Sequence, residues 1–192
     1  MKLHHSLIPL LACGLFAGHA MALTSAEHQA EKDRIAATYK SEKAHCDTLK
    51  GNAEDVCEEE AKGKRKIAEA ELEQRREPSE RNAQKVRMAR ADAAYEVAKE
   101  KCDDLSGNAK DVCEKDAKAA HVKAVEEAKV ARAANASGES RSEKAANVAE
   151  SRQDAAKETR DAQYKAAAER CDAMSGDAKD QCVADAKRRF AQ

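Results

Sequence analysis

The sequence contains a threefold repeat built around paired cysteines, and this repeat limits the folds that the chain can adopt. Each pair is separated by eleven positions, and the copies read CDTLKGNAEDVC, CDDLSGNAKDVC and CDAMSGDAKDQC. A tyrosine lies seven residues before the first cysteine of every copy, and an Ala-Lys pair begins four residues after the second. The tyrosines are Tyr39, Tyr95 and Tyr164. Such self-similarity indicates an array of one repeated supersecondary unit.

Each copy is typical of a helical hairpin. In the second copy, Leu105-Ser106-Gly107 is a helix stop in which glycine can adopt a left-handed conformation, and Asn108 is expected to cap the next helix. Cys102 lies five positions before Gly107, and Cys113 lies five positions after Asn108. Two antiparallel arms then hold the thiols at matching heights, within bridging distance. The spacing predicts three disulfides: Cys46 with Cys57, Cys102 with Cys113, and Cys171 with Cys182.

A heptad stripe runs along the first arm of each copy. Its members in the second copy are Met88, Ala91, Tyr95, Ala98, Cys102 and Leu105, in steps of three and four. The other copies place on it Ile35, Tyr39, Cys46 and Leu49, and Tyr164, Ala167, Cys171 and Met174. We expect this stripe to pack against the returning arm, with each tyrosine over alanines. The alternative is a thrice-repeated aromatic contact for an extended ligand such as a glycan or peptide.

Helix breakers and caps divide the chain into three hairpins. Thr24 with Glu27, and Ser140 with Glu143, are capping boxes. Pro78 separates the first hairpin from the second. The predicted units are residues 23–77, 78–138 and 139–192. The predicted fold is all-α: three disulfide-stapled antiparallel helical hairpins, six Ala-rich helices in all, in an elongated coiled-coil-like bundle.

Composition explains why such a chain needs its disulfides. Charged residues make up 37% of the sequence and aromatic residues 3%. Only 21 large apolar side chains occur in the 170 residues from Leu23 onward. This excludes compact α/β enzymes and β-sandwiches, which need many branched and aromatic residues. Each disulfide would contribute about 3 kcal/mol, so three together compare with the total stability of an ordinary domain.

The first 22 residues are typical of a secretory signal peptide. Residues 7–17 are apolar, and Ala20-Met21-Ala22 is the small-x-small pattern of a cleavage site. We expect cleavage after Ala22 and a periplasmic protein without a transmembrane anchor, because the apolar stretch is too short to span a membrane. Disulfides persist in such an exported compartment. The alternative is a lipoprotein that is processed at Cys13.

No cluster of residues typical of a catalytic or metal-binding site recurs with the repeat. Thiols separated by ten intervening residues do not form a redox motif, and two thiols are too few for a metal site. His28, His45 and His121 do not recur between copies and are expected to be solvated. A net charge of −1 argues against a nucleic-acid partner. We therefore predict no catalytic, cofactor-binding or metal-ligating residues, no cofactor and no small-molecule substrate.

The repeat resembles a group of small uncharacterised exported proteins of Gram-negative bacteria that are labelled TolA-like or cell envelope biogenesis proteins. The shared pattern is the tyrosine, the CDxLxGNAKDVC motif and the Ala-Lys pair after a signal segment, and it covers nearly all of the chain from Leu23 onward. The resemblance implies a helical envelope protein and supplies no functional residues. We expect a non-enzymatic structural or interaction protein that contacts an envelope protein or itself. The alternative is a chaperone-like binding module.

Overall fold

The structure is a computed structural model that describes residues 23–192. The predicted signal segment, with Cys13, lies outside the described residues. The elements are α1 (Ser25–Cys46), α2 (Asn52–Arg76), α3 (Glu80–Lys101), η1 (Cys102–Asp104), α4 (Asn108–Asn135), α5 (Arg141–Glu169), η2 (Arg170–Ala173) and α6 (Gly176–Phe190). The described chain holds no strand, which confirms the all-α prediction.

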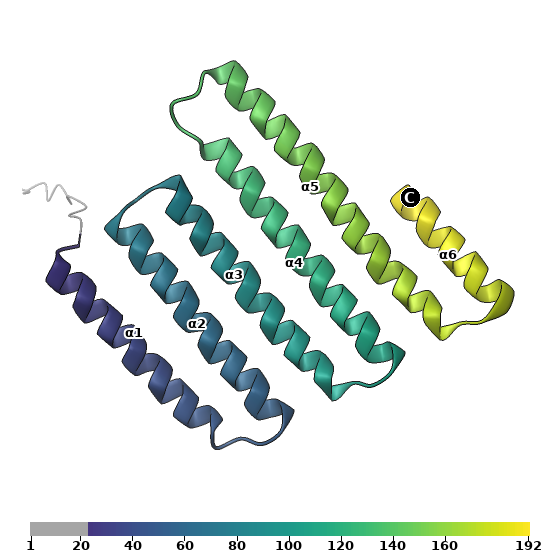
Figure 1. Cartoon of the computed structure of the whole chain (residues 1–192), viewed down its shortest axis with the longest axis horizontal. Helices are drawn as coiled ribbons and strands as arrows, with labels where there is room; N and C mark the ends of the chain where they lie inside the picture. The colour runs from purple at the N-terminus through teal and green to yellow at the C-terminus, as the bar shows by residue number, and fades with distance from the viewer. Residues whose placement is uncertain (1–22) are drawn as a thin grey trace, which may run out of the picture.

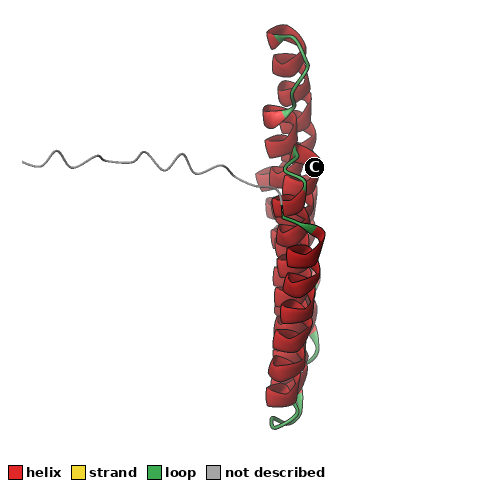
Figure 2. Ribbon diagram, turned by 90° about the vertical axis from the view of Figure 1, so that its left-hand side faces the viewer, coloured by secondary structure: helices red, strands yellow, loops and turns green. Residues whose placement is uncertain are grey.

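The six helices form a single layer. Consecutive helices run antiparallel and lie side by side (Figure 1), and every extensive helix–helix contact joins neighbours in the chain. Seen from its side, the layer is one helix thick (Figure 2). We call α1 with α2, α3 with α4, and α5 with α6 hairpins 1, 2 and 3. The interfaces between hairpins, α2–α3 and α4–α5, are more extensive than those within them, so the hairpins pack together as one array.

Both predicted capping boxes are formed. Thr24 Oγ1 accepts a hydrogen bond from the Glu27 backbone N–H at 3.2 Å, and the Glu27 carboxylate accepts one from the Thr24 backbone N–H at 2.8 Å. Ser140 and Glu143 form the same reciprocal pair. The hydrogen bonds from the Thr24 backbone and hydroxyl lower the pKa of Glu27, and those from Ser140 lower the pKa of Glu143. The charged carboxylates thus stabilise the starts of α1 and α5.

The prediction that Asn108 caps α4 is wrong. Gly107, with φ of 56°, is itself the cap residue, and no side chain caps this helix. Asn108 is the first residue of α4 and donates from Nδ2 to the backbone oxygen of Glu169 at 3.0 Å. Because glycine tolerates positive φ, the turn needs no residue between Gly107 and the helix. The asparagine is therefore free to link hairpin 2 to hairpin 3.

Few large side chains are buried in the layer. Ile35, Leu72 and Val86 are the large aliphatic residues of the described chain that are buried, and the other buried apolar positions are alanines and cysteines. A helix in a single layer has two neighbours and two exposed faces, so its buried strips are narrow. Small residues fill such strips at close helix separation.

The heptad stripe is buried only in part. Ala91 and Cys102 are buried, and Tyr95 is half-buried. Leu105 and Met174 were expected to face the returning arm, but they are 44% and 46% exposed. The reason is that both follow the short 3-10 segments at the hairpin ends, beyond the disulfide, where the chain has already left the helix that faces the returning arm.

A glycine sets the distance between hairpins 1 and 2. A Cβ placed on Gly63 would lie 2.7 Å from the Cβ of Ala93 across the α2–α3 interface. The Gly63→Ala substitution gains about 1 kcal/mol of helix propensity, but forcing the helices apart costs more. We expect a net loss of about 1 to 2 kcal/mol, measured as a lower urea midpoint.

The matched control for Gly63 is the second repeat. Ala119 occupies the equivalent position there, six residues after the second cysteine, and its replacement by glycine should cost only helix propensity, about 1 kcal/mol. Adding Ala93→Gly to Gly63→Ala should recover part of the loss. A Gly63→Ala protein more stable than wild type would show that the helices separate without cost.

Candidate functional site

The three disulfides lie along one edge of the layer, which we call the cysteine edge. The predicted pairs are formed, with Cα–Cα distances of 5.4 Å, 5.7 Å and 5.7 Å. The turns of all three hairpins lie on this edge, and the connections between hairpins lie on the opposite one (Figure 1). The first cysteine of each pair is fully buried and the second partly buried. Burial of this kind is typical of structural disulfides.

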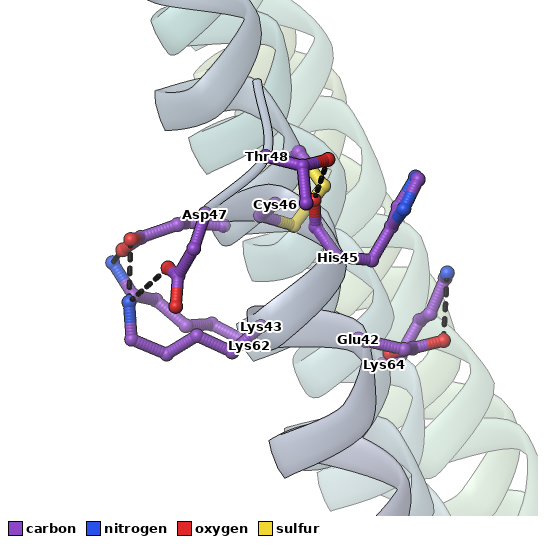
Figure 3. The surroundings of a disulfide bond; sticks show 10 residues. Glu42, Lys43, His45, Cys46, Asp47, Thr48, Lys62 and Lys64 are labelled. Carbon is purple, nitrogen blue, oxygen red and sulfur yellow. Dashed lines mark hydrogen bonds and ion pairs between the residues drawn. A yellow bond between two sulfur atoms is a disulfide. The ribbon is translucent and has the colours of Figure 1, made fainter. Parts of the chain in front are cut away.

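Ion pairs surround the first disulfide and join the two arms of hairpin 1 (Figure 3). Lys43 Nζ lies 2.6 Å from Glu58 Oε1 on the opposite arm and 3.4 Å from Asp47 Oδ1. The hydrogen bonds from Lys43 and then from Lys62 lower the pKa of Glu58. Farther along the arms, Lys64 pairs with Glu42 at 3.0 Å. These contacts hold the arms in register at the cysteine edge.

One acidic cluster lies on this edge. The carboxylates of Asp47, Glu54 and Glu58 approach one another within 4.8 Å. The later repeats place lysine where the first has Glu54, and these lysines bridge the arms: Lys110 to Asp103 at 2.7 Å, and Lys179 to Asp172 at 2.9 Å. Because Lys43 pairs with Asp47 and Glu58, and Lys62 pairs with Glu58, the cluster is part of an ion-pair network.

Two of the three tyrosines pack on the returning arm. The Arg65 guanidinium carbon lies 4.3 Å from the centre of the Tyr39 ring. Tyr95 stacks on His121 with 4.7 Å between ring centres. Arg65, His121 and Phe190 share one repeat position, eight residues after the second cysteine. Sequence reasoning missed this position because its residue type changes from copy to copy.

Two of the histidines are not solvated as expected. His28 Nε2 lies 2.9 Å from Glu73 Oε1, and His121 Nε2 lies 2.7 Å from Asp92 Oδ1. Their side chains are 12% and 16% exposed. Both therefore join neighbouring helices within a hairpin, which a view of isolated helices could not predict.

The boundaries between hairpins carry a recurring ion pair. The residue before the first cysteine of one hairpin pairs with the residue three positions after the second cysteine of the preceding hairpin. Lys101 lies 3.8 Å from Glu60, and Arg170 lies 2.6 Å from Asp116. The sequence contains this signal, since the first position is always His, Lys or Arg and the second always Glu or Asp, but the pairing is recognisable only once the packing register is known.

The first boundary also carries an electrostatic conflict. Burial, and then the negative charges of Asp103, Asp55 and Glu59, raise the pKa of Glu100. At the second boundary, the residue equivalent to Glu59 is Lys115, which lies 3.9 Å from Glu169. The like charges at the first boundary therefore weaken an interface that the opposite charges at the second support.

Removing the charge of Glu100 should stabilise the protein. A raised pKa in the folded state means that ionised Glu100 costs stability above that pKa, and that the cost disappears as the pH falls below the unfolded-state value. We expect Glu100→Gln to raise the melting temperature at pH 7 by about 1 to 2 °C, and the gain to vanish in acid. Glu150→Gln, at an exposed position of α5, is the control. An equal gain at both pH values would contradict the electrostatic cause.

An open groove lies on one face of the layer. It has a volume of about 760 Å³ and lies between α4 and α5 beside the end of α6. Val130, Ala131, Ala155, Ala156 and Phe190 supply its apolar lining, and charged side chains flank them. The groove could take an apolar segment.

Comparison with protein-family models, with curated proteins and with solved structures gives no match for this chain. Among the described residues, no helix combines the length and apolar character needed to cross a membrane. The fold and the site define the chain as a single-layer array of disulfide-linked helical hairpins.

Proposed function

We propose that this chain is a non-enzymatic scaffold or spacer of the bacterial periplasm that presents helical hairpins to an envelope partner. The observation that carries the proposal is the single layer itself, held by three buried disulfides along one edge. Helices of up to 29 residues at an axial spacing of ~8 to 10 Å give a plate roughly 50 Å wide and about 40 Å long. Such a plate offers much surface for little buried core.

Export supports the proposal. Disulfides persist in oxidising compartments, and the predicted signal segment directs the chain to the periplasm. The resemblance to exported envelope proteins points the same way. Disulfides stabilise a periplasmic structural protein without the need for a bound cofactor or for metabolic energy.

Intact-mass measurement of the chain released from the periplasm tests the export step. The proposal expects an N-terminus at Leu23 and a mass lower by six hydrogens than that of the reduced chain, two for each disulfide. An acylated Cys13, an uncleaved Met1 or a protein with free thiols would contradict it.

Site-specific photocross-linking in living cells tests the scaffold. Probes replace Leu105 and Met174, which are exposed on the cysteine edge in hairpins 2 and 3. A scaffold should give cross-links to the same partner from both hairpins, because the partner contacts repeated ends. A probe at Asp154, an exposed position of α5, is the control. Cross-links from one hairpin alone would contradict a repeated contact surface.

The groove between α4 and α5 favours a second candidate, a binding module for apolar peptide segments. Its lining of small apolar side chains and Phe190 would accept an extended or helical segment. Probes at Ala131 and Ala156 distinguish the two functions. The binding module expects cross-links there and none from the cysteine edge, whereas the scaffold expects the reverse.

A further inference from the structure

The two ends of the array each carry one half of the ion pair that recurs at every hairpin boundary. Within the chain this pair is Lys101 with Glu60, and Arg170 with Asp116. In hairpin 1 the first position is held by His45, which is exposed. In hairpin 3 the second position is held by Asp185, which is 67% exposed and pairs with Arg188 of its own helix. Among the described residues, neither His45 nor Asp185 has an ion-pair partner in another hairpin.

The outer edge of α1 has the surface of a hairpin boundary. Three positions in α3, and the same three in α5, lie at the boundary with the preceding hairpin. Counted back from the first cysteine of each hairpin, α1 has the same three positions. In α3 and α5 these residues are buried or half-buried, whereas in α1 every one of them is exposed. The sets are Val86, Ala93 and Val97 in α3, Ala155, Ala162 and Ala166 in α5, and Ala30, Ala37 and Ser41 in α1. All members of the α1 set are small, so the outer edge of α1 leaves room for the side chains of a second helix.

The outer edge of α6 complements this surface in charge. When the register of the internal boundaries is continued, Asp185 lies beside His45. Arg188 lies opposite the small Ala37, one turn from the exposed Asp33. The next pair of equivalent positions carries no charge in the proposed contact. The first boundary places Glu59 near Glu100, whereas the continued boundary places Ala184 near Ala44. Asp185 therefore meets a side chain that can donate a hydrogen bond to it, and Arg188 has a carboxylate of opposite charge within reach.

We propose that a second copy of this chain occupies the outer edge of α1, with α6 of one copy packed antiparallel against α1 of the next. The contact continues the side-by-side packing of the layer and uses two different surfaces, so it is heterologous and does not close on itself. Because the layer is flat (Figure 2), further copies extend it in its own plane. α6 has 15 residues and α1 has 22, so this contact is shorter than the internal ones and depends on protein concentration.

This inference deepens the proposed scaffold but is tested apart from its localisation and partner, because it needs only the purified oxidised chain. Sedimentation velocity from about 10 to 500 µM should show a weight-average mass that rises with concentration and falls with added salt. If the purified chain does not associate, the inference is overturned, but the proposed scaffold function and its cross-linking test are unaffected.

Charge variants identify the surfaces. His45→Lys installs the residue that the second repeat has at this position, and should tighten association about three- to fivefold. Asp185→Lys should weaken it at least fivefold, and combining Asp185→Lys with His45→Asp should restore it. Asp154→Lys makes the same charge change at an exposed position of α5 and should have no effect. Circular dichroism melts verify that each variant remains folded.

Two results would overturn the proposal. A chain that stays monomeric over the whole concentration range has no such contact. A dimer that is insensitive to Asp185→Lys but is lost on Ala37→Trp would instead pair two α1 helices about a twofold axis.

Discussion

Replacing Cys102 and Cys113 together by serine is expected to lower the free energy of unfolding by about 3 kcal/mol. The disulfide closes a loop of twelve residues, counted from one cysteine to the other, and its loss restores the conformational freedom of that loop to the unfolded chain. A protein that buries few large side chains has little other stability to offset the loss. Urea denaturation monitored by circular dichroism at 222 nm measures the change.

The pair must be replaced together, because a single serine would leave a free thiol that can exchange with the other disulfides. Reduction of all three disulfides in the wild-type chain should remove most cooperative unfolding but leave partial helix. The arms retain their helix-forming residues and their opposite charges one turn apart, such as Lys43 with Asp47 and Lys62 with Glu58. Denaturation curves that coincide with and without the disulfides would contradict a structural role.

Leu72→Ala is expected to have the second-largest effect, a loss of about 2 to 3 kcal/mol. Leu72 is 1% exposed and is the largest fully buried side chain of the described chain. Its truncation leaves a void at the α2 end that lies far from the cysteine edge, where no covalent link holds α1 and α2 together.

The control for Leu72 is Leu105→Ala, which removes the same atoms from a side chain that is 44% exposed. We expect that variant to lie within about 0.5 kcal/mol of wild type. Similar losses for the two variants would mean that the burial of Leu72 adds nothing to its contribution to stability. Urea midpoints for both proteins decide between these outcomes.

The hairpins could be predicted from sequence because they are local. The capping boxes at Thr24 and Ser140 act within one turn of helix, and the disulfide Cys102–Cys113 spans a turn whose residues lie between the two cysteines. Propensity, capping and ring closure over such short distances depend little on the rest of the molecule.

The sideways packing could not be predicted in the same way. α1 shows almost no segregation of apolar from polar residues around its axis, so its sequence does not indicate which side faces α2. The close approach of Gly63 to Ala93 and the pairing of Lys101 with Glu60 depend on the register between hairpins. That register follows from the sum of many small contacts, no one of which is distinctive in sequence.

The two edges of the layer differ in what holds them, and this has a mechanical consequence. Covalent links close every hairpin at the cysteine edge, whereas the hairpins connect to one another at the opposite edge through residues 77–79 and 136–140. Tension between the ends of the chain would therefore pull neighbouring helices apart, but it could not open the turn between the two cysteines of each disulfide. The fully extended oxidised chain would accordingly be shorter than the reduced chain by the length of three such turns.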